Sequence, residues 1–265
     1  AKFIVVFIIF GAFLERTGIA NFFIDLANSV AGSASGGPAK VAVVASALEG
    51  MVSGSSVANT VGSGSITIPL MKKTGYRAEF AGAVEAAAST GGQIMPPIMG
   101  AAAFLMTEYV NEPYGQIAVR AILPAVLYFL GIFIAVHLEA KKFGLRGIPR
   151  SELPKFTQLI RKIYLLAPLV ILISLVTSNS NTIQVSASIA IIVAVVASLF
   201  DKDNRITPKR FFEALAAGAR GTITVAVACG IAGVIAGCIT VTGLGSKLIS
   251  GVIALSGGNV MIGRS

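Results

Sequence analysis

The chain has 265 residues, of which 55% are hydrophobic and only 12% are charged, and its mean hydropathy is +0.83. Soluble domains carry about 25% charged residues, so this composition excludes an ordinary soluble protein and predicts an all-α polytopic membrane protein. The net charge of +9 does not indicate nucleic-acid binding, because the basic residues form short clusters between apolar runs, as cytoplasmic loops do.

Residues 1–31 are predicted to form the end of a transmembrane helix, over residues 2–14, and then an amphipathic helix that lies at the membrane interface or braces its neighbours. The apolar residues of this second helix recur at helical spacing, with polar residues largely between them: Ile19, Phe22, Phe23, Leu26 and Val30. The chain starts without Met inside an apolar run and stops abruptly, so we expect it to be a piece of a longer protein.

A polar, glycine-rich stretch at Ser53–Ser65, SGSSVANTVGSGS, separates two apolar arms within residues 38–71. Each arm has about fifteen residues, or roughly 22 Å of helix, which is too short for a hydrocarbon core of about 30 Å. Lys40 marks one outer end, and Lys72 and Lys73 mark the other. We therefore predict a re-entrant hairpin that enters the membrane, turns and leaves on the same side. Its polar tip must face protein or a water-filled cavity, which predicts a binding site there.

Residues 77–110 are long enough to cross a membrane, but the stretch Ser89–Pro97, STGGQIMPP, interrupts them in the middle. Proline removes a backbone donor and adjacent glycines weaken a helix, so the sequence predicts a broken transmembrane helix with an unwound centre. The hairpin and the broken helix together make residues 32–112 the predicted first half of a transport domain.

Scaffold-type transmembrane helices are predicted in residues 113–210. A further long helix is predicted near Phe212–Val241, within residues 211–265. The three helices of the first region are expected near Tyr114–Ala140, Tyr164–Thr177 and Ile183–Phe200, with the turn Ser178–Asn181 between the last two.

Basic residues give the orientation. Residues 72–77, 141–162 and 202–210 hold three, seven and four of the 21 basic residues, and they lie on one side if the predicted crossings between them are correct. The positive-inside rule makes that side cytoplasmic, so the hairpin is predicted to open toward the cytoplasm.

A weak internal repeat relates the two ends of the chain. The tripeptide Thr17–Ile19 resembles Thr242–Leu244, apolar runs precede both copies, and five predicted crossings separate them. An odd number of crossings gives the copies opposite orientations, and inverted repeats with discontinuous helices are typical of secondary transporters. Residues 211–265 would then be the start of a second inverted repeat, truncated before its own hairpin.

Three long segments resemble the large membrane subunit of tripartite ATP-independent periplasmic (TRAP) transporters: GSSVANTVGSGSITIPLMKKTGY, AEFAGAVEAAASTGGQIMPPIMGAAAF and VHLEAKKFGLRGIPRSELP. They are most similar to fused permeases that work with TAXI-type solute-binding proteins. The resemblance implies an elevator-type transporter in which a periplasmic binding protein delivers a small organic acid or amino acid. An ion gradient, typically of sodium, would drive uptake. It also implies a small four-helix membrane subunit or fused segment as a partner, and a multi-pass location in a bacterial or archaeal cytoplasmic membrane.

The same resemblance places substrate and ion contacts on the hairpin tip and on the break. The tip residues are Ser53, Gly54, Ser55, Ser56, Asn59 and Thr60. The break supplies Ser89, Thr90, Gly91, Gly92 and Gln93, with Pro96 and Pro97 holding it open. Sodium would be bound by backbone and hydroxyl oxygens near residues 53–59 and 91–93, and no cofactor besides the coupling ion, sodium or a proton, is expected. The structural alternative for each Ser and Thr is helix packing or a bond to its own backbone.

Two acidic residues are candidates for ion coupling, because an ionisable residue at membrane depth is costly and marks a functional site by default. Glu49 would either couple transport to protons or pair with a nearby basic group. Glu85, one turn before the predicted break, would orient the unwound segment.

No P-loop, HExxH or GxSxG motif occurs in the chain, so we expect a transporter and not an enzyme. Three alternatives stay open. They are an ion-coupled permease that needs no binding protein, an ion channel with the hairpin as a filter-like loop, and an intramembrane enzyme that uses Glu49 or Glu85.

Overall fold

The computed structural model describes residues 2–151, 153–154, 156–178, 182–200 and 204–255, and every regular element among them is a helix, as the sequence predicts. The chain divides into two compact units, Ala1–Thr222 and Ile223–Ser265. Residues 179–181 of the predicted turn, and residues 256–265 at the end of the predicted second repeat, lie outside the described residues.

The first two helices, α1 (Lys2–Arg16) and α2 (Ile19–Ala31), meet at a bend of 68°. Gly18 makes this bend with a φ of 78°, a conformation that glycine adopts without a steric penalty. The α2 helix is amphipathic, as predicted, and it braces the hairpin by packing against α3 (Gly37–Ser53). Its apolar face differs in one respect from the prediction, because Val30 is 70% exposed whereas Ala31 is buried.

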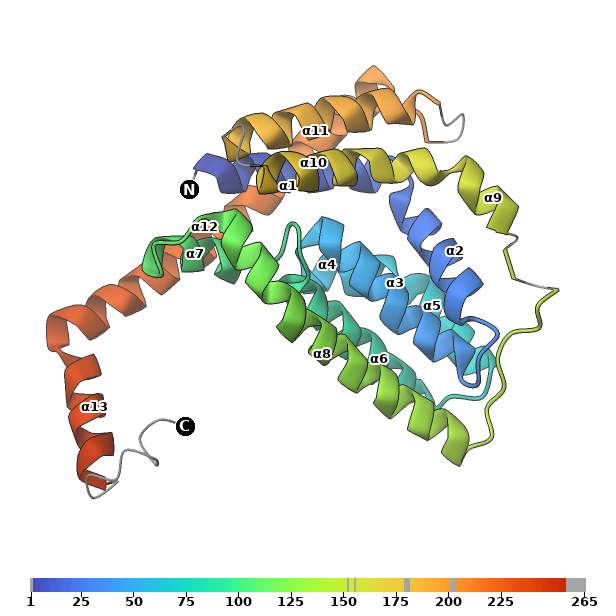
Figure 1. Ribbon diagram of the computed structural model, residues 1–265, viewed down its shortest axis with the longest axis horizontal. Coiled ribbons are helices and arrows are strands. Elements are labelled where there is room, and N and C mark those ends of the chain that lie inside the picture. Colours follow the sequence, from blue (N-terminus) through green and yellow to red (C-terminus); the bar gives the residue numbers. More distant parts are fainter. Residues whose placement is uncertain (1, 152, 155, 179–181, 201–203, 256–265) are drawn as a thin grey trace. The chain divides into compact units, whose positions relative to one another are not determined.

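The two arms of the predicted hairpin are present, with α3 as one arm and α4 (Ser56–Gly62) and α5 (Gly64–Lys73) as the other. Figure 1 shows the arms side by side, in agreement with their contacts. Gly54 makes the turn with a φ of 58°, and the Ser55 hydroxyl caps α4 by accepting a hydrogen bond from the amide of Ala58 (3.3 Å). The 17 residues of α3 span roughly 26 Å, which is short of the hydrocarbon thickness.

The predicted broken helix consists of α6 (Ala78–Gly91), the 3₁₀ turn η1 (Gly92–Ile94) and α7 (Ala101–Tyr109). The break begins at Gly92 and not at Ser89 as predicted, because Ser89, Thr90 and Gly91 still belong to α6. The loop between the half-helices is closed by a hydrogen bond from the amide of Gly100 to the carbonyl of Gln93 (2.7 Å).

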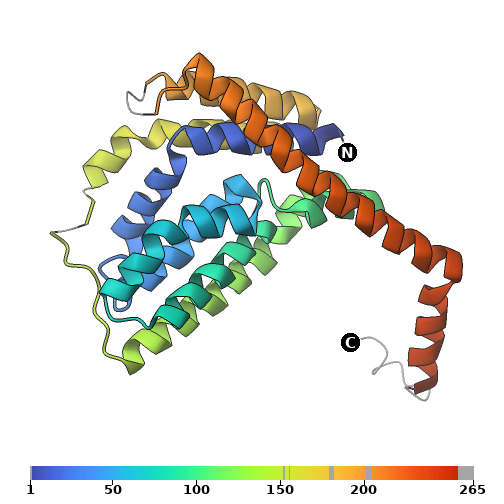
Figure 2. The same cartoon turned by 180° about the vertical axis from the view of Figure 1, so that it is seen from behind.

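Five further elements follow in the first unit: α8 (Tyr114–Lys142), α9 (Phe156–Arg161), η2 (Ile163–Leu166), α10 (Ala167–Thr177) and α11 (Ile183–Ser198). The α8 helix packs along α3 and α6, whereas α10 pairs with α11, and α11 packs against α1 (Figures 1 and 2). By length and composition α8 can cross a membrane, and the apolar helices at Ile163–Thr177 and α11 are shorter.

The last long helix, α12 (Pro208–Thr242), is also long and apolar enough to cross a membrane. Its first turns pack on α1, where Glu213 pairs with Arg16 (2.6 Å) and the ring of Phe211 lies 5.0 Å from that of Phe13. In the second unit, Gly243 turns the chain from α12 into α13 (Leu244–Leu255) with a φ of 63°. Both copies of the sequence repeat therefore share a helix–glycine–helix junction.

Lys40 lies in the first turn of α3, at the predicted outer end of the hairpin, but it is buried. Its side chain is only 5% exposed, and its Nζ lies 3.1 Å from Nδ1 of His137 on α8 and 5.2 Å from the centroid of the Phe133 ring. The lysine therefore ties the hairpin to α8. Lys72 and Lys73, at the end of the other arm, are exposed as expected.

Candidate functional site

The hairpin tip and the break lie directly against each other. A Cβ added to Gly92 in η1 would lie 2.8 Å from the Cα of Gly50 in α3, so the two main chains are in contact at this point. A Cβ on Gly54 would collide with the carbonyl oxygen of Met99 in the break loop. Small residues allow such close approach of backbones inside membranes. The structure thus brings together two elements that the sequence predicted to share one site.

Two polar contacts reinforce this meeting of tip and break. Gln93 Nε2 donates a hydrogen bond to the hydroxyl of Ser56 (2.7 Å), which joins the break to the start of α4. Asn59 is fully buried, and its Nδ2 donates to the carbonyl oxygen of Ser46 (2.8 Å) in the opposite arm. The same nitrogen would lie 3.2 Å from a Cβ on Gly92, so Asn59 lines the contact between tip and break.

Other predicted site residues lie nearby but use their side chains locally. The hydroxyls of Thr60 and Thr90 donate to the carbonyls of Ser56 (2.8 Å) and Ala86 (2.7 Å), each within its own helix. The contacts between Ser53 and Ser55, on either side of the turn, are long at 3.5 Å, and the Ser55 hydroxyl caps α4. The bonds of the two threonines correspond to the structural alternative considered for these residue types.

Glu85 on α6 lies in a cage of hydroxyl groups. Its side chain has no exposed surface. Its carboxylate accepts hydrogen bonds from four hydroxyls: Ser46 on α3 (3.0 Å), Ser63 between α4 and α5 (2.5 Å), Thr67 on α5 (2.5 Å) and Ser89 on α6 (3.2 Å). Hydrogen bonds to an ionised acceptor are among the stronger ones in proteins. Glu85 therefore ties both hairpin arms to α6.

The predicted position of Glu85 needs correction. It lies about two turns before the break, not one, because the break starts at Gly92. Three of its four hydrogen-bond donors come from the hairpin, so it fixes the hairpin on α6, and its role in orienting the unwound segment stays a prediction.

Sequence reasoning missed Ser46, Ser63 and Thr67. One signal could have found two of them, since Ser63 and Thr67 are four residues apart and lie on one helical face, as Glu85 and Ser89 do. Pairing the Ser63/Thr67 face with the Glu85/Ser89 face would have predicted hydroxyl groups around the acid. Ser46 carries no comparable local signal.

Glu49 on α3 is also buried, with 7% exposure, and its Oε2 has no hydrogen-bond partner among the described residues. Its other carboxylate oxygen lies so close to Gly62 that a Cβ there would collide with it. The ion pairs found in the described part of the chain join Arg16 to Glu213, Arg77 to Glu139 and Arg120 to Glu112. None of these pairs involves Glu49, so no basic partner is found for it among the described residues.

Tyr114, the first residue of α8, holds the break from the other side. Its hydroxyl lies 2.8 Å from the carbonyl oxygen of Pro97 and 2.5 Å from that of Ile98, and its single proton serves one of them at a time. Its ring stacks on Phe104 of α7, with centroids 5.1 Å apart. The tyrosine thus connects the unwound loop to the helix that follows it.

Tyr114→Phe is expected to loosen the break without disturbing the ring stack. Loss of one hydrogen bond costs about 1 kcal/mol, so we expect a lower melting temperature of the complete permease and slower initial uptake. Tyr109→Phe is the matched control, because Tyr109 is 64% exposed. Equal melting temperatures and uptake rates for the two variants would contradict the role assigned to the Tyr114 hydroxyl.

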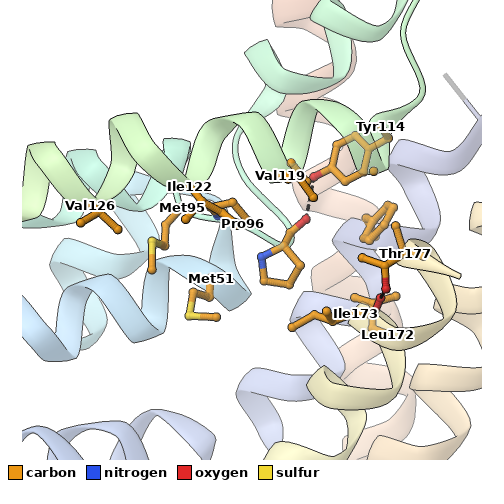
Figure 3. Close-up of a pocket in the computed structure, with 15 residues that line it drawn as sticks. Met51, Met95, Pro96, Tyr114, Val119, Ile122, Val126, Leu172, Ile173 and Thr177 are labelled. Atoms are coloured by element: carbon orange, nitrogen blue, oxygen red, sulfur yellow. Dashed lines mark hydrogen bonds between the residues drawn. The ribbon is translucent and has the colours of Figure 1, made fainter.

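An apolar cavity of about 240 Å³ lies beside the break, between α8 and α10 (Figure 3). Its walls include Met51 from the hairpin and Met95, Pro96 and Pro97 from the break. The hydroxyl of Thr177, also in the wall, donates to the carbonyl of Ile173 (2.7 Å). None of the described residues that line the cavity is charged, so it offers nothing to balance a carboxylate. The polar tip and break are therefore the better candidate site for a charged ligand.

Residues 1–263 match the family model described as "Tripartite ATP-independent periplasmic transporter, DctM component". The chain belongs to this family. The resemblance seen in the sequence is thus confirmed at the level of the family, which consists of membrane permeases of TRAP systems and is not a known enzyme class.

Three curated relatives of this DctM-family chain define the extent of the match. The C4-dicarboxylate TRAP transporter large permease protein DctM of Pseudomonas aeruginosa is 29% identical over 198 residues, which cover 73% of the chain and 45% of the relative. The sialic acid TRAP transporter large permease protein SiaM of Vibrio cholerae is 25% identical over 222 residues, or 83% of the chain and 51% of the relative. The sialic acid TRAP transporter permease protein SiaT of Haemophilus influenzae is 30% identical over 152 residues, or 57% and 24%.

The chain thus spans about half the length, or less, of these curated relatives. Their printed names give dicarboxylate and sialic acid permeases, and none of the three mentions the TAXI type that the sequence resembles most.

Proposed function

We propose that this chain forms part of the large permease of a TRAP system, a secondary active transporter that takes up a small organic acid or amino acid with a coupling ion, preferentially sodium. The observation that carries the proposal is the contact of the hairpin tip with the break, at Gly50 against Gly92 and Gly54 against Met99. Helix ends that meet at membrane depth are the recurring ion and substrate sites of secondary transporters.

The polarity of the helix ends supports a cation at this place. The α3 helix ends at Ser53 and α6 ends at Gly91, so the carbonyl-bearing C-termini of both helices lie at the contact. The last carbonyls of a helix lack intrahelical partners and carry partial negative charge, which favours a cation. We propose that carbonyl and hydroxyl oxygens of residues 53–59 and 91–93 bind the sodium ion.

The N-terminus of α7, the second half of the broken helix, supports a place for the solute next to the hairpin tip. This helix starts at Ala101, and helix N-termini favour anions. Exposed or half-buried polar groups lie at the same tip, among them Ser56 and Gln93. The anionic group of an organic acid is proposed to bind there, and residues 32–112 would act as the first half of a transport domain.

An elevator-type arrangement with inverted repeats is proposed on two observations. The short arms of the hairpin favour a re-entrant element that opens on the basic, cytoplasmic side. The left-handed glycines at the junctions Gly18 and Gly243 support the relation between the two ends of the chain. Residues 113–210 would then supply scaffold-type helices, and residues 211–265 would begin the second repeat.

The proposed partners follow from the family and from the sequence motifs. They are a periplasmic solute-binding protein, of the TAXI type by the closest motif resemblance, and a small four-helix membrane subunit or fused segment in the bacterial or archaeal inner membrane. The solutes in the relatives' names, C4-dicarboxylates and sialic acid, are the first compounds to test together with amino acids such as glutamate.

Uptake by the complete permease in proteoliposomes is expected to require both an inward sodium gradient and the binding protein. Dissipating the sodium gradient at fixed pH should reduce uptake to background, whereas dissipating a pH gradient at a fixed sodium gradient should leave the uptake rate unchanged. Uptake without the binding protein would instead favour an ion-coupled permease that needs none. Single-channel currents would favour the channel, and chemical conversion of the solute would favour an intramembrane enzyme.

A further inference from the structure

Glu49 is an acid whose charge is not balanced by the residues around it. It lies within α3 with 7% exposure, and its Oε2 has no hydrogen-bond partner in the described part of the chain. Burying an ionised carboxylate without a partner is strongly unfavourable, so such a group normally holds a cation or a proton.

The charged groups that face Glu49 are themselves acidic. Glu85 from α6 and Glu15 from α1 act on it electrostatically, and Ser63 between α4 and α5 offers a hydroxyl. Basic groups elsewhere in this part of the chain act on other residues. Lys40, in the first turn of α3, contacts His137 and faces the like-charged Lys141 of α8, and Lys162 faces Asp25 of α2. A charged Glu49 would therefore lie among other acidic side chains, with no basic group of the described residues acting on it.

Glu85 and Glu49 differ in the hydrogen bonds that each receives. Four hydroxyls donate to Glu85, and they leave its carboxylate well solvated by the protein. Glu49 has an unpartnered oxygen instead, with Gly62 packed against the other one. Of the two acids, Glu85 thus has hydroxyl donors around its carboxyl group, whereas Glu49 has an oxygen that no donor among the described residues reaches.

We propose that Glu49 binds a proton inside the closed hairpin, at a site separate from the sodium site at the tip. Binding adds one proton to one carboxylate oxygen and removes one negative charge from between the two arms. A proton fits better than a metal ion, because it needs no shell of oxygen ligands. In the described residues no group of three or more His, Cys, Asp or Glu side chains could hold a metal. The proposal needs only the closed hairpin and does not rest on the proposed transport activity.

Infrared spectroscopy of the complete permease tests this directly, because a protonated carboxyl group has a C=O band that a carboxylate lacks. We expect the wild-type protein to keep such a band at neutral pH and Glu49→Gln to lose it. Glu79→Gln is the matched control, since Glu79 is an exposed acid in the first turn of α6 and its loss should leave the band unchanged. Persistence of the band in Glu49→Gln overturns the proposal.

Two further measurements complete the test. Loss of the wild-type band on addition of sodium at fixed pH also overturns the proposal, because the bound species would then be a metal ion. If Glu49→Gln does not fold, judged by its melting temperature and gel filtration, Glu49→Asp replaces it. A band that shifts in this variant supports a proton on residue 49, and an unshifted band overturns it. The spectra need no uptake measurement, so they are independent of whether the chain transports sodium.

Discussion

Gly92→Ala is expected to abolish uptake by the complete permease and to lower its melting temperature. The added Cβ would lie 2.8 Å from the Cα of Gly50, a main-chain atom of α3 that cannot turn aside as a flexible side chain can. Overpacking of this kind costs about 1–3 kcal/mol. Here it also pushes apart the tip and the break, whose contact forms the proposed ion site. Gly50→Ala should act in the same way from the other side.

Gly82→Ala is the matched control for this prediction. Gly82 lies in α6, as part of the same broken helix, and a Cβ there would meet nothing within 4 Å. Alanine favours a helix interior over glycine by about 0.5–1 kcal/mol, so the control should transport normally and melt at the same or a higher temperature. Normal uptake by Gly92→Ala would refute the assignment of the site to the contact between tip and break.

Glu85→Ala is expected to detach the hairpin from α6 and to give the second large effect. The buried hydroxyl of Ser89 would lose its acceptor at 3.2 Å. Ser46 can still turn to the hydroxyl of Ser63 (3.3 Å), and the hydroxyls of Ser63 and Thr67 can turn to carbonyls of their own helical segments. An unsatisfied buried donor costs about 1–3 kcal/mol, and the emptied volume adds to this loss. We expect the melting temperature and the uptake rate to fall together.

Comparison of two substitutions at Glu85 separates charge from volume. Glu85→Gln keeps the side chain's size and one carbonyl acceptor, so its melting temperature should lie between those of the wild type and Glu85→Ala. Glu79→Ala removes an exposed acid from the same helix and should leave uptake intact. A wild-type melting temperature for Glu85→Ala would show that the hydroxyl cage does not stabilise the hairpin.

Most helices of the structure could be predicted from local chemistry. Long apolar runs predict α8 and α12, and the glycines and prolines predict where the hairpin turns and where the crossing helix breaks. The exact ends of the helices are harder to predict from local chemistry, as the broken helix shows. The predicted start at Ser89 was wrong because a helix continues while its amides find carbonyls one turn back, and the proline pair that ends this possibility lies further on.

The partners of the buried polar groups could not be predicted from spacing along the chain. In the sequence, Lys40 indicates only a charged end of a helix. In the structure it contacts His137, which lies 97 residues further along the chain. The four hydroxyls around Glu85 lie up to 39 residues from it along the chain. Such contacts depend on which helix faces pack together, and each apolar helix with a few hydroxyls allows many such packings.

Length, apolarity and the positions of glycine and proline are enough to predict a polytopic membrane protein with a hairpin and a broken helix, because these properties act locally. The resemblance to TRAP permeases comes from three long sequence segments. The contact of tip and break at Gly50 and Gly92 depends on the fold, as do the hydroxyls around Glu85 and the unpartnered oxygen of Glu49. Such features cannot be read along the chain, since the stability of a buried charge depends on its neighbours in space and these come from distant segments.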